Sequence, residues 1–521
     1  MRKPPGLSGL SFVSRQLMLP AVVAFVILSL LTSLLMNTAS QPNPASFVVN
    51  VDASRPIYTM RGGIGASWHA MSQDPPLENE RYDYPVRVAN PRGSAYGGNP
   101  PAGATALWDQ LYRHATWLGL DWVRVEVSLR MWAPEKGVFQ WNSDEMQALC
   151  RILDWCEKNH AEVFLQNMWS HVEWNAYPGV HPILSAPLDI DAFAEAMARI
   201  AAHLTKTRRY TCIKWFCITN EPPGGTWGYW WSTGSEPGIT ITPALKAVRA
   251  AFDRRGLAIP LSAPDWTDLP RLDPAKIDFD SFVGAYDIHS YQGVDPNRQA
   301  ILADWAHFAH SHGKPFFLSE MGNMQLGWGA ANSGPKTFAA SLSNAETIVR
   351  GLAAGVDAFN RWSYTNRGDL DGQWQLVHTW DRDKKRYLDK IEPEPAAYFG
   401  YGILTRLIAK HSKVLTVEKT GEGTDPERTL VAALQAPDGN VTVVLLNLDQ
   451  KPVAANVTLA GRRAGTFFKY QITQAKVEQP GFRLVAEPAA AGKNEGLSDN
   501  LPPESITVFS TFHLEPEAPG R

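Results

Sequence analysis

The sequence predicts an α/β protein, namely a (β/α)₈ TIM barrel with an accessory C-terminal β-sandwich domain. Three observations lead to this fold class. Short β-rich apolar segments alternate with helix-like amphipathic stretches over about 350 residues, which is typical of a closed parallel barrel. From residue 413 the pattern changes to alternating strands separated by turn signals, as in a sandwich. A chain of 521 residues is also too long for one ordinary hydrophobic core, so two folded units are expected.

The N-terminal segment has the layout of an export signal. Three basic residues and no acidic one precede an uncharged run rich in leucine and valine over residues 17–36, and small and then polar residues follow. Residues 1–40 are therefore a predicted signal peptide or N-terminal membrane anchor, since the apolar run is also long enough to span a bilayer. Both interpretations place the body of the protein outside the cell, either secreted or tethered to the outer face of the cytoplasmic membrane.

Residues 45–412 form the predicted barrel. Its expected strands are 62–66, 122–127, 162–166, 213–219, 260–263, 284–289, 315–320 and 357–362. Its expected helices include 145–159, 190–207, 243–255, 298–311, 337–354 and 398–411. A doubly wound open sheet gives a similar alternation, but no Gly-rich phosphate loop follows the first strand, which disfavours the dinucleotide-binding version.

Residues 413–515 form the predicted sandwich. Its expected strands are 430–434, 441–447, 455–459, 466–472 and 505–514, with turn signals at 437–440 and at Gly461. Residues 45–52 at the start of the barrel region also alternate, and they are a candidate extra strand of this sandwich.

Composition excludes one class of partner. The formal net charge is −3, and no basic run with interleaved aromatic residues occurs, so no nucleic-acid partner is expected. The 19 tryptophans suit large cores or a sugar-binding surface, because the flat indole face stacks well on apolar faces.

Two glutamates follow apolar barrel strands. Residues 215–219 end in Asn220-Glu221-Pro222, where proline prevents further strand pairing, and residues 315–319 lead into Glu320. Because the carboxyl ends of barrel strands meet at one face, both carboxyl groups are expected in the same site. Such a pair suits glycosidic cleavage, in which one carboxylic acid protonates the leaving oxygen and one carboxylate attacks the anomeric carbon. The negative charge of the second group keeps the first protonated by raising its pKa.

The two motifs, Thr-Asn-Glu-Pro and Leu-Ser-Glu-Met-Gly, resemble those of the clan A glycoside hydrolases, a retaining superfamily that includes the cellulase-like family five. Further positions match the clan pattern. Arg124 resembles the second-strand arginine that contacts the nucleophile, and His289 and Tyr291 resemble the sixth-strand pair in which tyrosine bonds to the nucleophile. Trp362 resembles the eighth-strand tryptophan that forms the floor of the −1 sugar subsite. The resemblance covers roughly residues 58–411.

The resemblance implies a retaining O-glycosidase acting on a β-linked oligo- or polysaccharide. Glu221 is then the acid/base, Glu320 the nucleophile, and Asn220 a hydrogen-bond partner of the sugar 2-OH. The layout of strand, barrel and sandwich is more similar to families thirty and thirty-nine of the clan, whereas residues 262–267 lack the Trp-Met-Lys run associated with family thirty.

Two further tryptophans at strand ends, Trp68 and Trp169, are candidate substrate-binding residues. The expected partner is a carbohydrate, and neither a metal nor an organic cofactor is expected. Two alternatives remain open at this point: a transglycosylase with the same pair of glutamates, and a non-catalytic carbohydrate-binding protein of the cell surface. A metal-dependent barrel hydrolase would need several converging histidines or acids.

Overall fold

The computed structural model describes the chain from Ala45 to Glu515 with several gaps. The described residues are 45–70, 98–170, 172–222, 229–232, 240–329, 332–366, 372–381, 383–384, 386–422, 425–461, 466–491 and 496–515. The predicted export segment 1–40, with its apolar run 17–36, lies outside them. Within this described part, no helix is long and apolar enough to cross a membrane.

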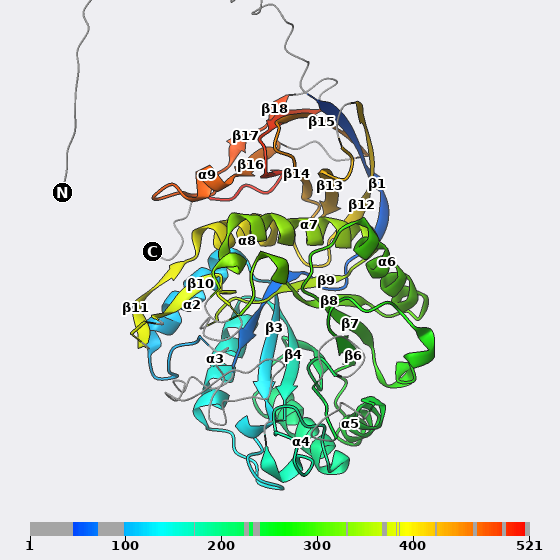
Figure 1. Ribbon diagram of the computed structural model, residues 1–521, viewed down its shortest axis with the longest axis vertical. Helices are drawn as coiled ribbons and strands as arrows, with labels where there is room; N and C mark the ends of the chain where they lie inside the picture. The colour runs from blue at the N-terminus through cyan, green and yellow to red at the C-terminus, as the bar shows by residue number, and fades with distance from the viewer. Residues whose placement is uncertain are drawn as a thin grey trace, which may run out of the picture. The chain divides into compact units, whose positions relative to one another are not determined.

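A closed barrel of eight parallel strands forms the centre of the molecule (Figure 1). Its strands are β2 (Ile64–His69), β3 (Trp122–Ser128), β4 (Glu162–Trp169), β5 (Ile213–Cys217), β6 (Leu261–Trp266), β7 (Ala285–Ser290), β8 (Phe316–Met321) and β9 (Ala358–Arg361). Ile64 of β2 pairs with Phe359 of β9, which closes the ring. The predicted barrel is confirmed, and closure excludes the open doubly wound sheet.

Helices surround the barrel. They are α2 (Thr105–Leu118), α3 (Asp144–Lys158), α4 (Ile190–Ala202), α5 (Thr242–Arg254), α6 (Pro296–Ser311), α7 (Phe338–Ala354) and α8 (Pro395–Thr405). A π-helical turn, His203–Thr207, continues α4, and short 3-10 turns occupy Leu129–Met131, Glu173–Asn175, Pro274–Lys276, Asp280–Phe282, Met324–Leu326 and Gly334–Lys336. Several helices begin at a side chain that accepts a backbone N–H of the first turn, which satisfies a donor that has no partner within the helix. These residues are Ser143, Asp189, Asp295 and Thr337.

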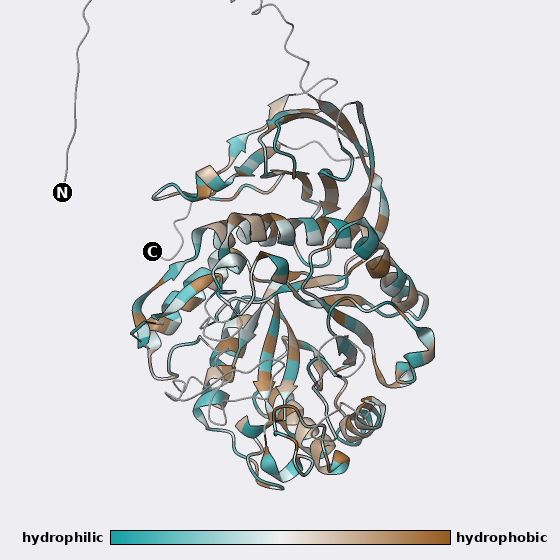
Figure 2. Cartoon of the chain, in the orientation of Figure 1, coloured by the Kyte–Doolittle hydropathy of each residue, from teal (hydrophilic) through white to brown (hydrophobic). Residues whose placement is uncertain are grey.

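The barrel interior changes from apolar to polar along the strands. An apolar cluster of the barrel consists of Trp122, Phe164, Cys217, Ala285, Phe317 and Ala358. Since side chains alternate between the two faces of a strand, residues two positions further on also face inward. On β3 these are Arg124 and then Glu126, whereas Val123 and Val125 pack against the helices. Apolar and polar residues alternate in this way along the strands in Figure 2. The polar groups therefore collect at the carboxyl ends.

The remaining strands form a ten-stranded sheet, in the order β17-β16-β20-β14-β13-β12-β1-β15-β19-β18 among the described residues. Their bounds are β1 (Ser46–Thr59), β12 (Lys413–Glu422), β13 (Thr429–Gln435), β14 (Val441–Asn447), β15 (Val453–Ala460), β16 (Phe468–Ile472), β17 (Glu487–Pro488), β18 (Ala490–Ala491), β19 (Leu497–Leu501) and β20 (Ser505–Ser510). A short helix, α9 (Gln474–Val477), follows β16. The N-terminal β1 pairs antiparallel with β12 and parallel with β15, so it belongs to this sheet.

The two faces of β14 belong to different cores. Val443 and Leu445 point into the core of the sheet itself, whereas Val444 and Leu446 belong to the core that the sheet shares with the barrel. Figure 1 shows α7 and α8 between the sheet and the barrel strands. The hydroxyl of Thr442 donates to the carbonyl of Leu407 at 2.6 Å across this junction. The barrel and the sheet thus form one compact unit from Ala45 onward.

Among the elements that the sequence analysis did not predict is a hairpin beside the barrel. An antiparallel hairpin of β10 (Val377–Asp381) and β11 (Arg386–Pro393) lies between the last barrel strand and α8.

Candidate active site

The two predicted glutamates meet at the carboxyl end of the barrel. Glu221 follows β5, and Glu320 lies within β8. One carboxylate oxygen of each, together with a ring nitrogen of His289, lies within 4.8 Å of the others. Glu221 is 9% exposed and Glu320 is 3% exposed. Glu221 also has a φ of 42°, a left-handed backbone conformation that costs a non-glycine residue energy and is frequent at functional sites.

Glu320 is held by two donors from opposite sides. The guanidinium of Arg124 forms an ion pair and hydrogen bond with Oε1, and the hydroxyl of Tyr291 donates to Oε2 at 2.5 Å. Arg124 is fully buried on β3, and its Nη2 donates to Oδ1 of Asn220 at 3.2 Å. Arg124 and Tyr291 thus both contact Glu320, as the resemblance implied, and Arg124 also connects Glu320 to Asn220.

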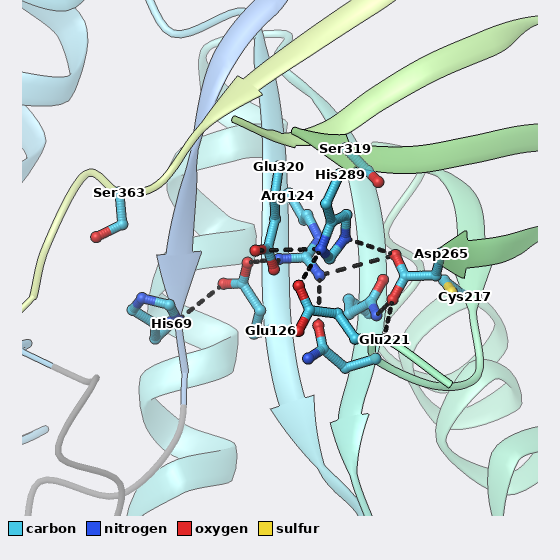
Figure 3. A network of polar contacts seen from close by, with 12 residues as sticks. His69, Arg124, Glu126, Cys217, Glu221, Asp265, His289, Ser319, Glu320 and Ser363 are labelled. Carbon is cyan, nitrogen blue, oxygen red and sulfur yellow. Dashed lines mark hydrogen bonds and ion pairs between the residues drawn. The ribbon is translucent and has the colours of Figure 1, made fainter. Parts of the chain in front are cut away.

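His289 on β7 connects Glu221 to an acid that the sequence analysis did not assign to the site. Its Nδ1 lies 2.8 Å from Oε1 of Glu221 and 3.4 Å from Oε2 of Glu320, while its Nε2 lies 2.9 Å from Oδ1 of Asp265 (Figure 3). Asp265 is fully buried near the end of β6. The signal that could have found it is its position, since polar residues at the carboxyl ends of barrel strands face the site.

Glu126 is a second missed acid. It lies two residues after Arg124 on the same strand, and its Oε1 accepts a hydrogen bond from Nη1 of Arg124 at 2.6 Å. Its Oε2 lies 3.1 Å from Nδ1 of His69, the last residue of β2. The spacing Arg124-x-Glu126 on a valine-rich strand was an available signal, because two charges on one buried face are stable only when they are paired.

Positive charge at the centre of this network offsets the acids. Although burial lowers it, the pKa of His289 is raised well above its usual range by Glu320 and Asp265. Burial also acts against the charge of Arg124, yet Glu320 and Glu126 raise the pKa of the guanidinium. For Glu126, burial raises the pKa, but His69 and Arg124 outweigh it and lower the pKa below the ordinary value.

Glu320 has a pKa above its ordinary value. Burial is the main cause, since it penalises the carboxylate, and the charge of Glu221 acts in the same direction. Arg124 and His289 oppose this rise because they favour the ionised form. The ionisation of Glu320 therefore depends on keeping its cationic neighbours in contact.

The predicted tryptophans occupy three different surroundings. Trp362 follows β9, and its ring contacts that of His69 edge-on with the ring centroids 4.6 Å apart, so it borders the site. Trp169 ends β4, and its ring centroid lies 6.0 Å from that of Tyr229, whose backbone N–H donates to the carbonyl of Glu221. Trp169 is thus placed beside Tyr229, which is hydrogen-bonded to the backbone of Glu221.

The prediction that Trp68 binds substrate is wrong. Its side chain is fully buried outside the barrel strands, packs against the rings of Trp108 and Tyr364, and donates from Nε1 to Oδ1 of Asn99 at 2.8 Å. The reason is strand parity, because the neighbouring Ser67 and His69 take the inward positions of β2 and leave Trp68 facing the helices.

Two groups of described residues have the composition of metal ligands: Cys217, Asp265 and Asp287, and Glu221, His289 and Glu320. In the first group, Asp287 accepts hydrogen bonds from Ser262 and Ser319, and the thiol of Cys217 donates to the carbonyl of Thr219. In the second group, Arg124 and His289 already provide positive charge to the carboxylates. The contacts in both groups are those of a hydrogen-bonded network of acids.

A closed (β/α)₈ barrel with two neighbouring glutamates at its strand ends is the architecture of the clan A glycoside hydrolases. The family model of the cellulases (glycosyl hydrolase family 5) matches residues 87–363, just over half of the chain, and the chain belongs to this family. The resemblance inferred from the sequence motifs is thereby confirmed. The comparison with curated proteins finds no match.

Solved structures with the same fold include members of family 30. The subfamily 8 xylanase Xyn30A from Clostridium acetobutylicum is 14% identical, with a TM-score of 0.57 over 89% of this chain and 98% of that chain. The catalytic domain of xylanase C from Talaromyces cellulolyticus is 15% identical, with a TM-score of 0.58 over 89% and 100%. The endo-β-1,6-glucanase BT3312 is 12% identical, with a TM-score of 0.59 over 90% and 94%. At these identities the likeness establishes a shared fold.

Proposed function

We propose that the protein is a retaining glycoside hydrolase that cleaves O-glycosidic bonds of a β-linked oligo- or polysaccharide by double displacement. The observation that carries this proposal is the closeness of the two glutamates, since a carboxylate oxygen of Glu221 lies within 4.8 Å of a carboxylate oxygen of Glu320. Carboxyl groups about 5 Å apart suit direct attack by one of them, whereas inverting enzymes need a wider gap of about 6.5–9.5 Å for a water molecule.

In the first step, a carboxylate oxygen of Glu320 attacks the anomeric carbon, and the bond to the leaving oxygen breaks. Glu221 gives its proton to that oxygen, so the leaving sugar departs as a neutral alcohol. In the second step, Glu221 removes a proton from water, the water oxygen attacks the anomeric carbon, and the bond to Glu320 breaks. Two inversions at the same carbon give overall retention.

The neighbours of the two glutamates support this division of roles. Arg124 and Tyr291 both donate to Glu320, which favours a carboxylate in one fixed orientation. Glu221 is the more exposed of the two and has His289 as its hydrogen-bonding neighbour. Arg124 donates to Asn220 as well as to Glu320, and Asn220 directly precedes Glu221 in the chain. Asn220 is therefore close to both glutamates, which supports its assignment as the partner of the sugar 2-OH.

The experiment is hydrolysis of a panel of aryl β-glycosides and of β-glucans, mannans, xylans and galactans. Xylans and β-1,6-glucans belong in the panel because proteins named for them share the fold. Wild type is compared with Glu320→Ala and with Glu478→Ala, a control on the helix turn after β16. We expect the first variant to be inactive and to form a glycosyl azide of inverted configuration when azide is added. Unchanged turnover by Glu320→Ala would contradict the mechanism, and an inverted hydrolysis product from wild type would contradict retention.

We also propose that the enzyme acts outside the cytoplasmic membrane, on the basis of the apolar run over residues 17–36 and the basic residues before it. Fractionation of cells that produce the full chain tests this proposal. Enzyme in the medium supports secretion, enzyme in the membrane fraction and open to added protease supports a tether, and enzyme confined to the cytosol contradicts both.

A further inference from the structure

Asp265 contacts Glu221 by two separate routes. Its Oδ2 accepts a hydrogen bond from the backbone N–H of Glu221 at 3.1 Å and another from Nε2 of Gln166 at 2.9 Å. Its Oδ1 faces Nε2 of His289 at 2.9 Å, and Nδ1 of His289 faces Oε1 of Glu221 at 2.8 Å. Figure 3 shows the resulting loop, in which one buried acid fixes both the backbone and the side chain of Glu221.

The two ring nitrogens of His289 both face carboxylate oxygens, and this restricts the protonation of the ring. A neutral imidazole has one N–H only, so both contacts are N–H donations only when the ring is a cation. The raised pKa of His289 agrees with this geometry, since Glu320 and Asp265 outweigh the opposing effect of burial. Burial raises the pKa of Asp265, but His289 outweighs it and lowers the pKa, so Asp265 is the anionic partner of that cation.

Donation from Nδ1 of His289 to Oε1 determines which oxygen of Glu221 carries the transferable proton. An oxygen that accepts this N–H is a poor site for the proton, which therefore resides on Oε2. The left-handed backbone of Glu221, with φ of 42°, must also be maintained, and Asp265 holds its N–H directly.

We propose that Asp265 is a positioning residue, which acts through His289 and through the backbone of Glu221 to present the Oε2 proton of Glu221 to the leaving oxygen. This inference rests on the proposed function, because it concerns the acid of the same reaction. It assigns to the carboxyl end of β6 a part in proton transfer, although Asp265 itself does not touch the reacting atoms.

Other titratable groups surround this loop from the neighbouring strands. They are Arg124 on β3, Cys217 on β5, Asp287 on β7, Glu320 on β8, and Tyr291 after β7. Burial, together with the charge of Asp265, raises the pKa of Asp287 well above its ordinary range, so Asp287 is the neutral member of that pair of acids. Nη2 of Arg124 lies 4.0 Å from Oδ1 of Asp265 and adds positive charge beside the oxygen that faces His289.

The test is the variant Asp265→Asn, which keeps the volume of the side chain but replaces one acceptor oxygen with a donor. It is assayed with the phenyl and the 2,4-dinitrophenyl β-glycoside of the sugar that wild type hydrolyses best. Dinitrophenolate leaves without help from an acid, whereas phenolate needs a proton. We expect kcat/KM to fall about 10²-fold for the phenyl glycoside, as for loss of general acid catalysis. The fall for the dinitrophenyl glycoside should be several times smaller. Azide should accelerate the dinitrophenyl reaction and give a glycosyl azide of retained configuration.

The matched control is Asp287→Asn, a buried change of the same size on the next strand that leaves both contacts of His289 in place. Any loss in this control should be equal for the two leaving groups. Equal losses for both substrates in Asp265→Asn would overturn the inference while the proposed function stands. Wild type that cleaves no β-glycoside would instead overturn the proposed function. If Asp265→Asn does not fold, as judged by circular dichroism, His289→Gln breaks the same loop and must show the same dependence on the leaving group.

Discussion

Arg124 and Glu320 form a buried ion pair across the barrel, from β3 to β8. The same guanidinium also contacts Glu126 on its own strand. Burial of charges is costly unless they are paired, so this arginine is needed both for the fold and for the orientation of Glu320.

Replacement of Arg124 by methionine should lower both activity and stability. Two buried carboxylates would lose their common partner, and we expect a cost of about 3–5 kcal/mol in the free energy of unfolding. Activity should fall at least about 10²-fold, because the nucleophile loses its charge partner. Urea unfolding and kinetics on the best substrate measure the two effects. Arg199→Met, which breaks an exposed ion pair with Glu195 on α4, is the control and should cost less than about 1 kcal/mol. Equal costs for both variants would contradict this account.

Tyr291→Phe should move the acidic limb of the pH profile. The hydroxyl of Tyr291 favours the carboxylate form of Glu320, so its loss raises the pKa of that group further. We expect the acidic limb of kcat/KM to move to higher pH by about half a unit to one unit, with a fall in kcat of about tenfold. Burial and Glu320 raise the pKa of Tyr291 well above 10, so the wild-type phenol remains a donor across this range.

The control for Tyr291→Phe removes another buried hydroxyl far from the site. Tyr58 donates to the carbonyl of Val356 at 2.8 Å, near the amino ends of the barrel strands. Tyr58→Phe should reduce stability by about 1 kcal/mol and leave the pH profile unchanged. A shifted pH profile in Tyr58→Phe would show that the acidic limb of kcat/KM responds to any loss of barrel stability, and not to Glu320 in particular.

Ionisation of the buried carboxyl group of Asp121 should lower the stability of the protein as the pH rises. Burial raises its pKa from the usual 3.8 to about 7, despite the N–H of Lys410 that it accepts. Between these two values the folded protein binds a proton that the unfolded chain has lost. Its contribution to stability is therefore fully present below pH 3.8 and is lost as the pH rises through about 7.

Asp121→Asn removes this titration. At pH 8 we expect the variant to melt at least about 2 °C above wild type, and the difference should shrink or reverse at pH 4. Asp109→Asn, at an exposed position of α2, serves as the control and should show no such dependence on pH. Parallel melting curves of wild type and Asp121→Asn at all pH values would disprove the prediction. Calorimetry at several pH values decides it.

Trp362→Phe and Trp68→Phe should separate binding from stability. Trp362 borders the site beside His69, so its replacement should raise KM or lower kcat by about tenfold. Trp68→Phe should leave both constants near the wild-type values but lower the free energy of unfolding by about 1–3 kcal/mol, since it removes packing and the bond to Asn99. A change in KM without a loss of stability in Trp68→Phe would restore this residue to the site.

The barrel was predictable because its signal is repeated eight times. Each strand is a short apolar run, and each is followed by a helical period, so single ambiguous segments do not change the outcome. The β10–β11 hairpin carries no such signal. Half of the residues in Arg386–Pro393 are charged and exposed, and the segment pairs through its backbone without an alternating apolar face.

The site was predictable where a residue type and a strand end coincide, as for Glu221 and Glu320. The site was less predictable where a residue's role depends on whether its side chain points into the barrel or towards the helices. Trp68 lies on a strand that is buried on both faces, and such a strand does not show in its sequence which residues point inward. Asp265 and Glu126 were missed because their importance comes from partners on other strands, His289 and His69, that the linear sequence does not bring together.

The pairing of β1 has a consequence for the synthesis of the chain. Phe47 of β1 lies opposite Gly421 of β12 and Ala455 of β15, so β1, the first strand among the described residues, has no partner until these later strands have been made. The candidate active site lies on the barrel, yet a nascent chain that stops before Lys413 leaves β1 unpaired and the apolar side of α7 and α8 uncovered. Such products expose strand edges and apolar surface, which makes them targets for chaperones and proteases. The packing around the barrel is therefore complete only after the strands of the ten-stranded sheet have been translated.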